Sequence, residues 1–303
     1  MITDLIFEFA ERTPDKTAVV YNGQPLSYRS FAANIALARG YFASRGVVGP
    51  GLAVLVIANM LDFWVVSLAL RSLGLTTIAV QSVPAFDELD PPAARCVVAS
   101  AAEALAGLEA RCAAPGLELL QVSLAGETAL WPNDIAPPER MGGHIQQTSG
   151  TTGVRKKVLI DPSFETPFMR RRGEGIGVVQ GSVVSVFAFG GGTGVGYNSA
   201  ISTWLVGATV VIDENRAPHL ALLQPGITHA MVTPDLLGQI LAAPATAFPR
   251  SGIMQLSVTG GSITQAQIEQ AKARITPHVF NRIASSETST WANTALEDPE
   301  DRR

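Results

Sequence analysis

Residues 52–80, "LAVLVIANMLDFWVVSLALRSLGLTTIAV", decide the fold of this chain. An apolar run of strand length, residues 52–59, is followed by a helical stretch that ends at Gly74 and by a second apolar run, "LTTIAV". Strands that are apolar along their whole length are buried on both faces, as in parallel sheets covered by helices. The stretch therefore predicts a strand–helix–strand unit of an α/β fold.

The same alternation returns after residue 160. Four strand candidates, "SVVSVFAF", "ATVVID", "HAMVT" and "QLSVTGG", are separated by helical stretches such as "TPDLLGQILAA" and "TQAQIEQAKARI". The last of these opens with Thr264 and Gln267 at capping-box spacing. We therefore expect two α/β lobes, about residues 1–160 and 161–303, with mostly parallel sheets covered by helices.

Near the N-terminus, "AVVYNGQPLSY" predicts a β-hairpin. Asn22 and Gly23 accept the positive φ angles that a two-residue type I′ turn requires. Ser27 then caps a helix. Four apolar residues of that helix recur at helical spacing: Phe31, Ile35, Ala38 and Phe42.

The composition is that of a compact globular protein. The 303 residues are 47% hydrophobic and 16% charged, with a net charge of −4, which argues against a broad nucleic-acid surface. Cys96 and Cys112 have neither metal-ligand spacing nor a disulfide framework, so we expect two reduced thiols. The first residues lack the basic and apolar regions of a secretory signal, and the expected location is cytoplasmic.

Residues 175–212 contain no charged residue, a stretch longer than the roughly 20 apolar residues of a membrane helix. Glycines and polar residues interrupt it, however, including Gln180, Asn198 and Ser199. A buried strand, a glycine loop and a buried helix explain it better than a membrane span.

The stretch "QQTSGTTGVRKKVLI", residues 146–160, suggests a polyphosphate site, because small residues expose backbone N–H groups and a lysine follows. It is not a Walker A loop, since, counted from Gly150, Arg155 stands where that motif has the glycine before its lysine, and no Ser or Thr follows Lys156. The glycine run "GGGTGVG" fits no frame of the dinucleotide motif G-x-G-x-x-G. Ser149 lacks the flanking glycines of a hydrolase nucleophile elbow.

The loop closely resembles the phosphate loop of the adenylate-forming superfamily, which includes acyl- and aryl-CoA synthetases, luciferases and the adenylation domains of peptide synthetases. The family pattern is Thr-Ser-Gly-Thr-Thr-Gly-x-Pro-Lys-x-Val. The matching residues are Thr148, Ser149, Gly150, Thr151, Thr152, Gly153, Lys156 and Val158. Arg155 replaces the proline. The resemblance implies an ATP site in which Lys156 acts on the leaving pyrophosphate.

Two further motifs extend the resemblance. The family has Asn-x-Tyr-Gly-x-Thr-Glu after a strand, where this chain reads "NRIASSE", residues 281–287. Asn281, Ser286 and Glu287 agree, whereas Ile283 and Ala284 replace the Tyr-Gly pair and Ser285 fills the open position. The resemblance implies that Glu287 binds Mg²⁺ and that its neighbours line the nucleotide. "SVTGGSIT" resembles the family's glycine turn beside adenine, implicating Gly260, Gly261 and Ser262.

The stretch "FAFGGGTGVGYNS" falls where the family places its carboxylate-substrate pocket, and three aromatic residues flank its glycines: Phe187, Phe189 and Tyr197. Aromatic residues more often belong to the core than to a pocket. The histidines, expected to be structural or exposed rather than catalytic, lie elsewhere: His144, His219, His229 and His278.

The function implied by the resemblance is ATP-dependent activation of a small carboxylic acid to an acyl-adenylate, followed by transfer to coenzyme A or a carrier thiol. Sixteen residues follow Glu287, and none matches the ribose-binding aspartate or the lysine-bearing C-terminal domain of the family. We therefore expect this chain by itself to bind nucleotide with little turnover. A non-catalytic nucleotide- or acyl-binding module is the alternative, which Arg155, Ile283 and Ala284 favour slightly. A phosphotransferase ranks third, because no catalytic base is evident.

Overall fold

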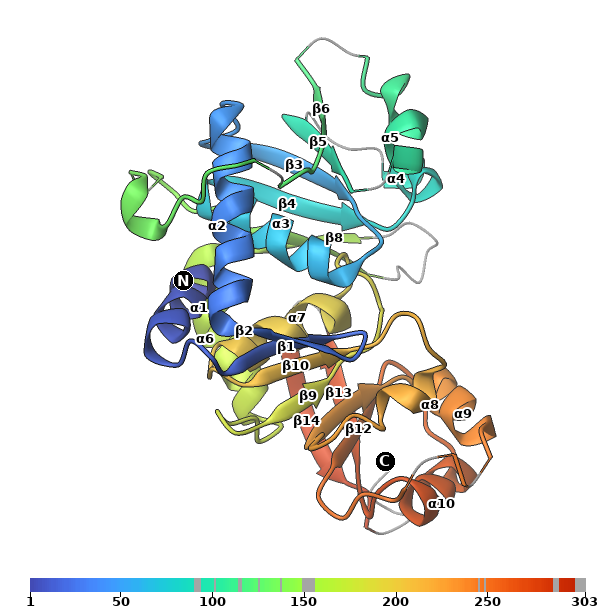
Figure 1. Cartoon of the computed structure of the whole chain (residues 1–303). Coiled ribbons are helices and arrows are strands. Elements are labelled where there is room, and N and C mark those ends of the chain that lie inside the picture. The colour runs from blue at the N-terminus through green and yellow to red at the C-terminus, as the bar shows by residue number, and fades with distance from the viewer. Residues whose placement is uncertain are drawn as a thin grey trace. The chain divides into compact units, whose positions relative to one another are not determined.

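The computed structural model describes residues 1–89, 94–100, 102–113, 116–124, 126–136, 138–148, 156–244, 246–247, 249–285 and 289–297. The chain divides into two compact units. Unit 1 comprises residues 1–16, 27–166 and 189–197, and unit 2 comprises residues 17–26, 167–188 and 198–303. Each unit is built on one sheet, and the two sheets are mostly parallel and flanked by helices, as the sequence predicts (Figure 1).

Unit 1 contains a six-stranded sheet of order β6-β5-β3-β4-β7-β8. Its strands are β3 (Gly51–Val56), β4 (Leu75–Val80), β5 (Cys96–Ala99), β6 (Glu118–Gln121), β7 (His144–Thr148) and β8 (Lys156–Ile160). Its helices are α1 (Ile2–Arg12), α2 (Tyr28–Ser44), α3 (Met60–Ser72), α4 (Val83–Leu89), α5 (Ala102–Glu109) and the short 3₁₀ helix Pro132–Asp134. The predicted strand–helix–strand unit is β3, α3 and β4, whose strands pair in parallel.

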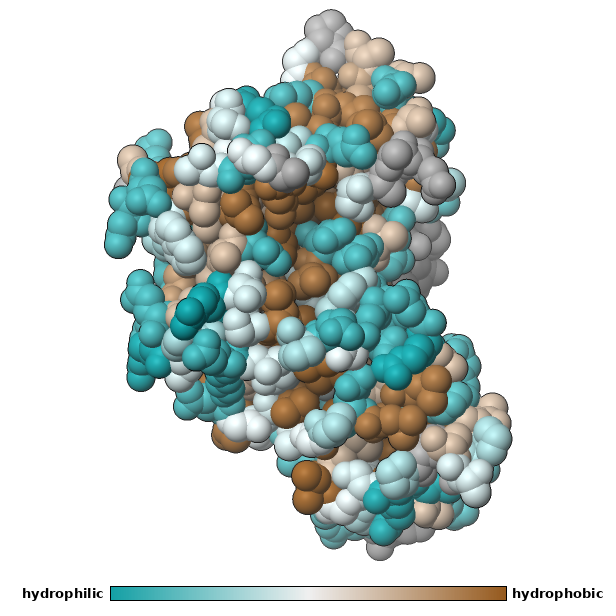
Figure 2. Space-filling view, in the orientation of Figure 1, coloured by the Kyte–Doolittle hydropathy of each residue, from teal (hydrophilic) through white to brown (hydrophobic). Residues whose placement is uncertain are grey.

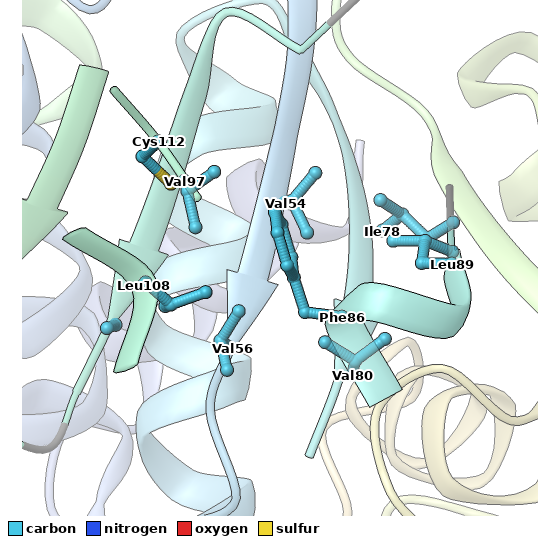
Figure 3. Close-up of a cluster of buried hydrophobic side chains, with 10 residues drawn as sticks. Val54, Val56, Ile78, Val80, Phe86, Leu89, Val97, Leu108 and Cys112 are labelled. Atoms are coloured by element: carbon cyan, nitrogen blue, oxygen red, sulfur yellow. The ribbon is translucent and has the colours of Figure 1, made fainter. Parts of the chain in front are cut away.

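The core of unit 1 explains why these strands are apolar throughout. Val54 on β3, Ile78 on β4 and Val97 on β5 are fully buried and pack against Phe86 of α4 and Leu108 of α5. Figure 3 shows these side chains converging between the strands and the two helices. Because helices lie over the strands, polar residues at these positions would be desolvated.

Unit 2 contains an eight-stranded sheet of order β14-β13-β12-β11-β9-β10-β1-β2. Its strands are β1 (Thr17–Tyr21), β2 (Gln24–Ser27), β9 (Val183–Ser185), β10 (Thr209–Ile212), β11 (His229–Val232), β12 (Gln255–Thr259), β13 (His278–Ser285) and β14 (Ser289–Ala295). Its helices are α8 (Pro218–Ala221), α9 (Pro234–Ala242) and α10 (Gln265–Arg274). The boundary between the units falls within α6 (Pro162–Glu174) and α7 (Gly194–Trp204).

Local signals in the sequence are confirmed. Asn22 and Gly23 have φ angles of 50° and 81°, as a type I′ turn requires. The Ser27 hydroxyl accepts a hydrogen bond from the Ser30 amide at the start of α2. Thr264 and Gln267 form the predicted capping box of α10.

The uncharged residues 175–212 are divided among several short elements: β9, a glycine loop, α7 and β10. Within the described part of the chain, every helix is too short or too polar to cross a bilayer. On the face drawn in Figure 2, hydrophobic residues gather over the strands of unit 1, and hydrophilic residues are interspersed with hydrophobic ones over α8, α9 and α10.

Candidate functional site

The predicted phosphate loop is closed by a β-hairpin of unit 1. Thr148 ends β7 and lies opposite Lys156, the first residue of the antiparallel strand β8. The loop residues Ser149, Gly150, Thr151, Thr152 and Gly153 lie outside the described residues, as does Arg155. The hairpin therefore brings the motif's first threonine and its lysine to the two ends of one loop.

Gln147 fixes the start of this loop. Its backbone N–H donates to the Gly192 carbonyl at 2.7 Å, and its side-chain amide donates to the Ala79 carbonyl at 2.9 Å. Both contacts lie within unit 1. The residue before Thr148 is thus tied both to the neighbouring strand β4 and to the glycine run, which limits where the phosphate loop begins.

The glycine run packs too tightly for side chains. A Cβ atom at Gly191 would lie 2.4 Å from the Phe63 ring, and one at Gly192 would lie 2.4 Å from the Ala79 carbonyl oxygen. Of the flanking aromatic residues, Phe187 and Tyr197 are buried, so they belong to the core rather than to an open pocket. Glycine is required at these positions because the backbone packs closely against α3 and β4.

In unit 2, the other two motifs meet at one pocket of about 380 Å³. Its lining is Gly260, Gly261, Ser262, Ile263, Asn281, Arg282, Ile283 and Ala284. The parallel pairing of β12 with β13 explains the meeting, because Thr259 lies opposite Arg282 and the glycine turn therefore follows beside Ile283. Ser285 ends β13, and the predicted residues Ser286 and Glu287 lie outside the described residues.

Two features shape this pocket. Gly260 has a φ of 83°, a conformation that favours glycine over other residues. The register between β13 and β14 shifts between Ile283 and Ala284, and such an irregularity redirects the side chains of a strand. Ile283 is 50% exposed, so an apolar surface lies where the family has its tyrosine.

A buried ionic network in unit 1 was not foreseen from the sequence. Arg71 of α3 pairs with Glu165 of α6 at 2.8 Å, and their side chains are 1% and 2% exposed. The Tyr197 hydroxyl donates to the second Glu165 oxygen at 2.5 Å and accepts a hydrogen bond from Arg71. Arg71 also donates to the Gly142 carbonyl at 3.1 Å. Burial alone would lower the pKa of Arg71, but Glu165 holds that pKa above its usual value.

His144 lies at the edge of this network and is structural, as expected. Its ring stacks on Tyr197 at 4.0 Å between centroids. Nε2 faces the Gly191 carbonyl at 2.9 Å and so donates to it, which leaves Nδ1 to accept from the Thr77 hydroxyl at 2.9 Å. Burial, followed by the charge of Arg71, lowers the pKa of His144 to about 3. The ring is therefore neutral and ties β7 to the glycine run.

A second, larger pocket of about 810 Å³ lies in unit 1. It is lined by Ala43, Val48, Gly49, Pro50, Leu73, Ile135, Ala136, Pro138, Glu139 and Arg140. Residues 48–50 and Leu73 precede β3 and β4, so this pocket lies at the amino ends of those strands. Ligands of α/β folds bind at the carboxyl ends of the strands. Thr148 lies at the carboxyl end of the neighbouring strand β7, so the phosphate loop, and not this pocket, is at the end of the sheet where ligands bind.

Fold and motif residues together define an α/β protein of the adenylate-forming class. A family model described as AMP-binding enzyme matches residues 6–303, and the chain belongs to this family. The resemblance drawn from the phosphate-loop, glycine-turn and Asn281 motifs is thereby confirmed. A search of curated proteins found no match.

Solved structures show the same fold. The N-terminal subdomain of Klebsiella oxytoca NpsA, in complex with 3-hydroxyanthranilyl-AMSN, has a TM-score of 0.79 at 16% identity, covering 98% of this chain and 76% of that chain. For E. coli MenE with bound OSB-AMS the TM-score is 0.77 at 19% identity, covering 97% and 62%. For the nonribosomal peptide synthetase FmoA3 it is 0.78 at 19% identity, covering 99% and 33%. At such identities the likeness establishes the fold.

Proposed function

We propose that this chain is the nucleotide-binding part of a ligase that activates a small carboxylic acid with ATP and passes the acyl group to a thiol. The observation that carries the proposal is the unit 2 pocket, where the glycine turn 260–262 and residues 281–284 form one surface. Membership of the AMP-binding enzyme family supports a nucleotide as its occupant.

The pocket has properties that suit a purine base. Gly260 and Gly261 carry no side chain, so a flat ring can approach the backbone closely. Ile283 offers an exposed apolar surface on which the ring can rest. An isoleucine makes a smaller contact with a ring than a tyrosine does.

The phosphates would be held by the loop that Thr148 and Lys156 close. The sequence of this loop is rich in small residues, which suits phosphate binding by backbone N–H groups, and Lys156 would bring a positive charge to the developing pyrophosphate. Among the described residues, no cluster of three acidic, histidine or cysteine side chains forms a metal site. Mg²⁺ commonly uses one or two protein carboxylates together with phosphate oxygens, so Glu287 would suffice to hold it. When bound, this ion neutralises charge on the phosphates.

The reaction needs positioning more than covalent chemistry from the protein. An oxygen of the substrate carboxylate attacks the α-phosphorus of ATP, and the bond between that phosphorus and the bridging oxygen breaks. The bonding electrons leave with pyrophosphate, which Lys156 stabilises. A thiol then attacks the acyl carbonyl of the adenylate, and AMP leaves.

The thiol acceptor is coenzyme A or a carrier-protein thiol. One similar structure is described as an o-succinylbenzoate CoA synthetase and another as an adenylation domain fused to a carrier domain. Because this chain spans 62% of MenE, the overall reaction is proposed for the complete ligase. We propose a cytoplasmic location.

The test is calorimetric titration of this chain with ATP and Mg²⁺, and separately with AMP. Lys156→Ala and Glu287→Ala should each weaken ATP binding at least tenfold, about 1.4 kcal/mol. The matched controls are Lys157→Ala, whose amine donates to the Leu89 carbonyl, and the exposed Glu297→Ala. Absence of binding at millimolar nucleotide, or equal effects of site and control variants, would contradict the proposal.

A non-catalytic nucleotide- or acyl-binding module is the second candidate, because Arg155, Ile283 and Ala284 depart from the motifs. Arg155→Pro and Ile283→Tyr separate the two. Higher ATP affinity of these variants would indicate that the site has lost part of its nucleotide-binding ability, as the second candidate predicts. Lower affinity would indicate that Arg155 and Ile283 contribute to ATP binding, as the ligase proposal predicts.

A further inference from the structure

Two buried arginines converge in unit 2. Arg172 of α6 and Arg282 of β13 are 4% and 2% exposed. Both guanidinium groups approach the sulfur of Met231 on β11, at 3.7 and 3.8 Å. Arg172 also donates to the Ser199 hydroxyl of α7 at 3.3 Å.

The positive charge of Arg172 is not neutralised within the described residues. Its described acceptors are a hydroxyl and a thioether, which are neutral, and its Nε has no hydrogen-bond partner. None of the described ion pairs includes it. Burial and then the charge of Arg282 lower the pKa of Arg172 well below its usual value, yet a guanidinium stays charged in proteins.

This environment is unlike that of Arg71, the buried arginine of unit 1, which pairs with Glu165. A buried cation that is neither paired nor fully hydrogen-bonded destabilises a protein. An anion bound to Arg172 would neutralise its buried positive charge. The anion would also accept a hydrogen bond from the Nε–H group, which has no partner among the described residues. The arrangement therefore has the chemistry of an anion site.

The sheet brings other polar groups to the same face. Met231 lies opposite Ser257 in register, and Thr259 lies opposite Arg282. Residues two apart on a strand share a face, so the four side chains line one side of the sheet. Ser257 and Thr259 are buried. The cluster formed by Arg172, Arg282, Ser199 and these two hydroxyls is hereafter the two-arginine cluster.

The two-arginine cluster shares one residue with the proposed nucleotide pocket, because Arg282 is among the residues that line it, together with Ile283 and Gly261. The guanidinium of Arg172, whose Nε has no hydrogen-bond partner among the described residues, offers the forked N–H geometry that matches a carboxylate.

We propose that the two-arginine cluster binds an anionic group of the acid substrate other than the carboxylate that is activated. This inference rests on the proposed function and names its substrate class: a dicarboxylic acid, or an acid with a comparable second anionic group. The group held here is not the reacting one, because charge-assisted hydrogen bonds to a carboxylate reduce its nucleophilicity and would slow attack on phosphorus.

The first test needs no ligand and measures the thermal stability of the full 303-residue chain. If the charge of Arg172 is unneutralised, Arg172→Met should melt at or above the wild-type temperature. The comparison variant is Arg71→Met, which should melt well below it because it strips Glu165 of its partner. A loss of stability in Arg172→Met as large as in Arg71→Met would show an internal counter-charge and would overturn the inference.

The second test measures binding of matched acids to wild type and to Arg172→Met by calorimetry, with and without AMP. The pairs are benzoate and isophthalate, hexanoate and adipate, and acetate and malonate. In the wild type, at least one diacid should bind tenfold more tightly than its monoacid, and Arg172→Met should lose that preference while still binding AMP. Equal binding within every pair, or an unchanged preference in the variant, would overturn the inference.

The two proposals fail separately in this design. AMP binding without any diacid preference would leave the proposed function standing and would remove the two-arginine cluster from the substrate site. A diacid preference that depends on Arg172, without any nucleotide binding, would support the anion site and contradict the proposed function.

Discussion

The Arg71–Glu165 pair makes a quantitative prediction about what holds unit 1 together. Arg71→Met removes the cation and leaves the Glu165 carboxylate buried, with its side chain 2% exposed. Of the described donors, the Tyr197 hydroxyl at 2.5 Å remains. Losing one partner of a buried pair costs about 3–5 kcal/mol of unfolding free energy. We therefore expect a loss in this range, with the Gly142 carbonyl also left without its donor.

Urea denaturation at pH 7 measures this loss, with m-values compared to check that unfolding remains two-state. Arg12→Met is the matched control, because Arg12 pairs with Glu8 in the open, at 68% and 48% exposure, where such a pair contributes less than about 1 kcal/mol. The double variant Arg71→Met with Glu165→Leu should recover much of the loss, because an apolar pair leaves no buried charge. A cost below about 1 kcal/mol for Arg71→Met, or losses that simply add in the double variant, would refute this reasoning.

Three further predictions concern packing and protonation. Gly191→Ala should destabilise the chain by about 1–3 kcal/mol in urea denaturation, since its Cβ would lie 2.4 Å from the buried Phe63 ring, whereas Gly181→Ala, with open space around it, should be nearly neutral. Stability should fall as pH drops from about 6.5 toward 3, by up to about 1.4 kcal/mol per pH unit from His144 alone, because its pKa is lowered to about 3 in the folded state and the unfolded chain takes up the proton first. His144→Gln should flatten that part of the pH profile, and an unchanged slope would contradict it. The Cys96 thiol, whose pKa burial raises to about 12, should react with a thiol reagent only after unfolding, and fast labelling of the native chain would contradict its burial.

Local chemistry made much of the fold predictable. The apolar runs in residues 52–80 became β3, α3 and β4 because their periodicity and length match buried strands and a buried helix. Turns and helix caps depend on residues at most three positions apart, so they could be predicted from the sequence alone. Examples are the turn at Asn22 and Gly23 and the caps at Ser27 and Thr264.

The charged core could not be predicted in this way. Arg71 follows the apolar stretch "VVSLAL", a position at which an arginine signals a buried partner, but that partner, Glu165, lies 94 residues away. Arg172 stands in "MRRRGE", where its neighbours make it look like part of a solvated charged face. Which arginine of that run is buried depends on how α6 packs, and this is not encoded in the local pattern.

For the candidate site, motif order indicated that the glycine turn and residues 281–284 belong together, and the pairing of β12 with β13 supplies the physical reason. The strand irregularity at Ile283 and Ala284 had no visible signal, because a register shift depends on the partner strand β14. The residues that the motifs implicate in the phosphate loop and in Mg²⁺ binding remain predictions.

The nucleotide pocket is tested most directly by photolabelling the chain with 8-azido-ATP and identifying the modified peptides by mass spectrometry. We predict labelling within residues 260–263 or 281–284, which line the unit 2 pocket, and its loss when unlabelled ATP competes. Labelling confined to other segments, such as residues 48–50 and 135–140 of the unit 1 pocket, or labelling that ATP does not displace, would contradict the proposed nucleotide site.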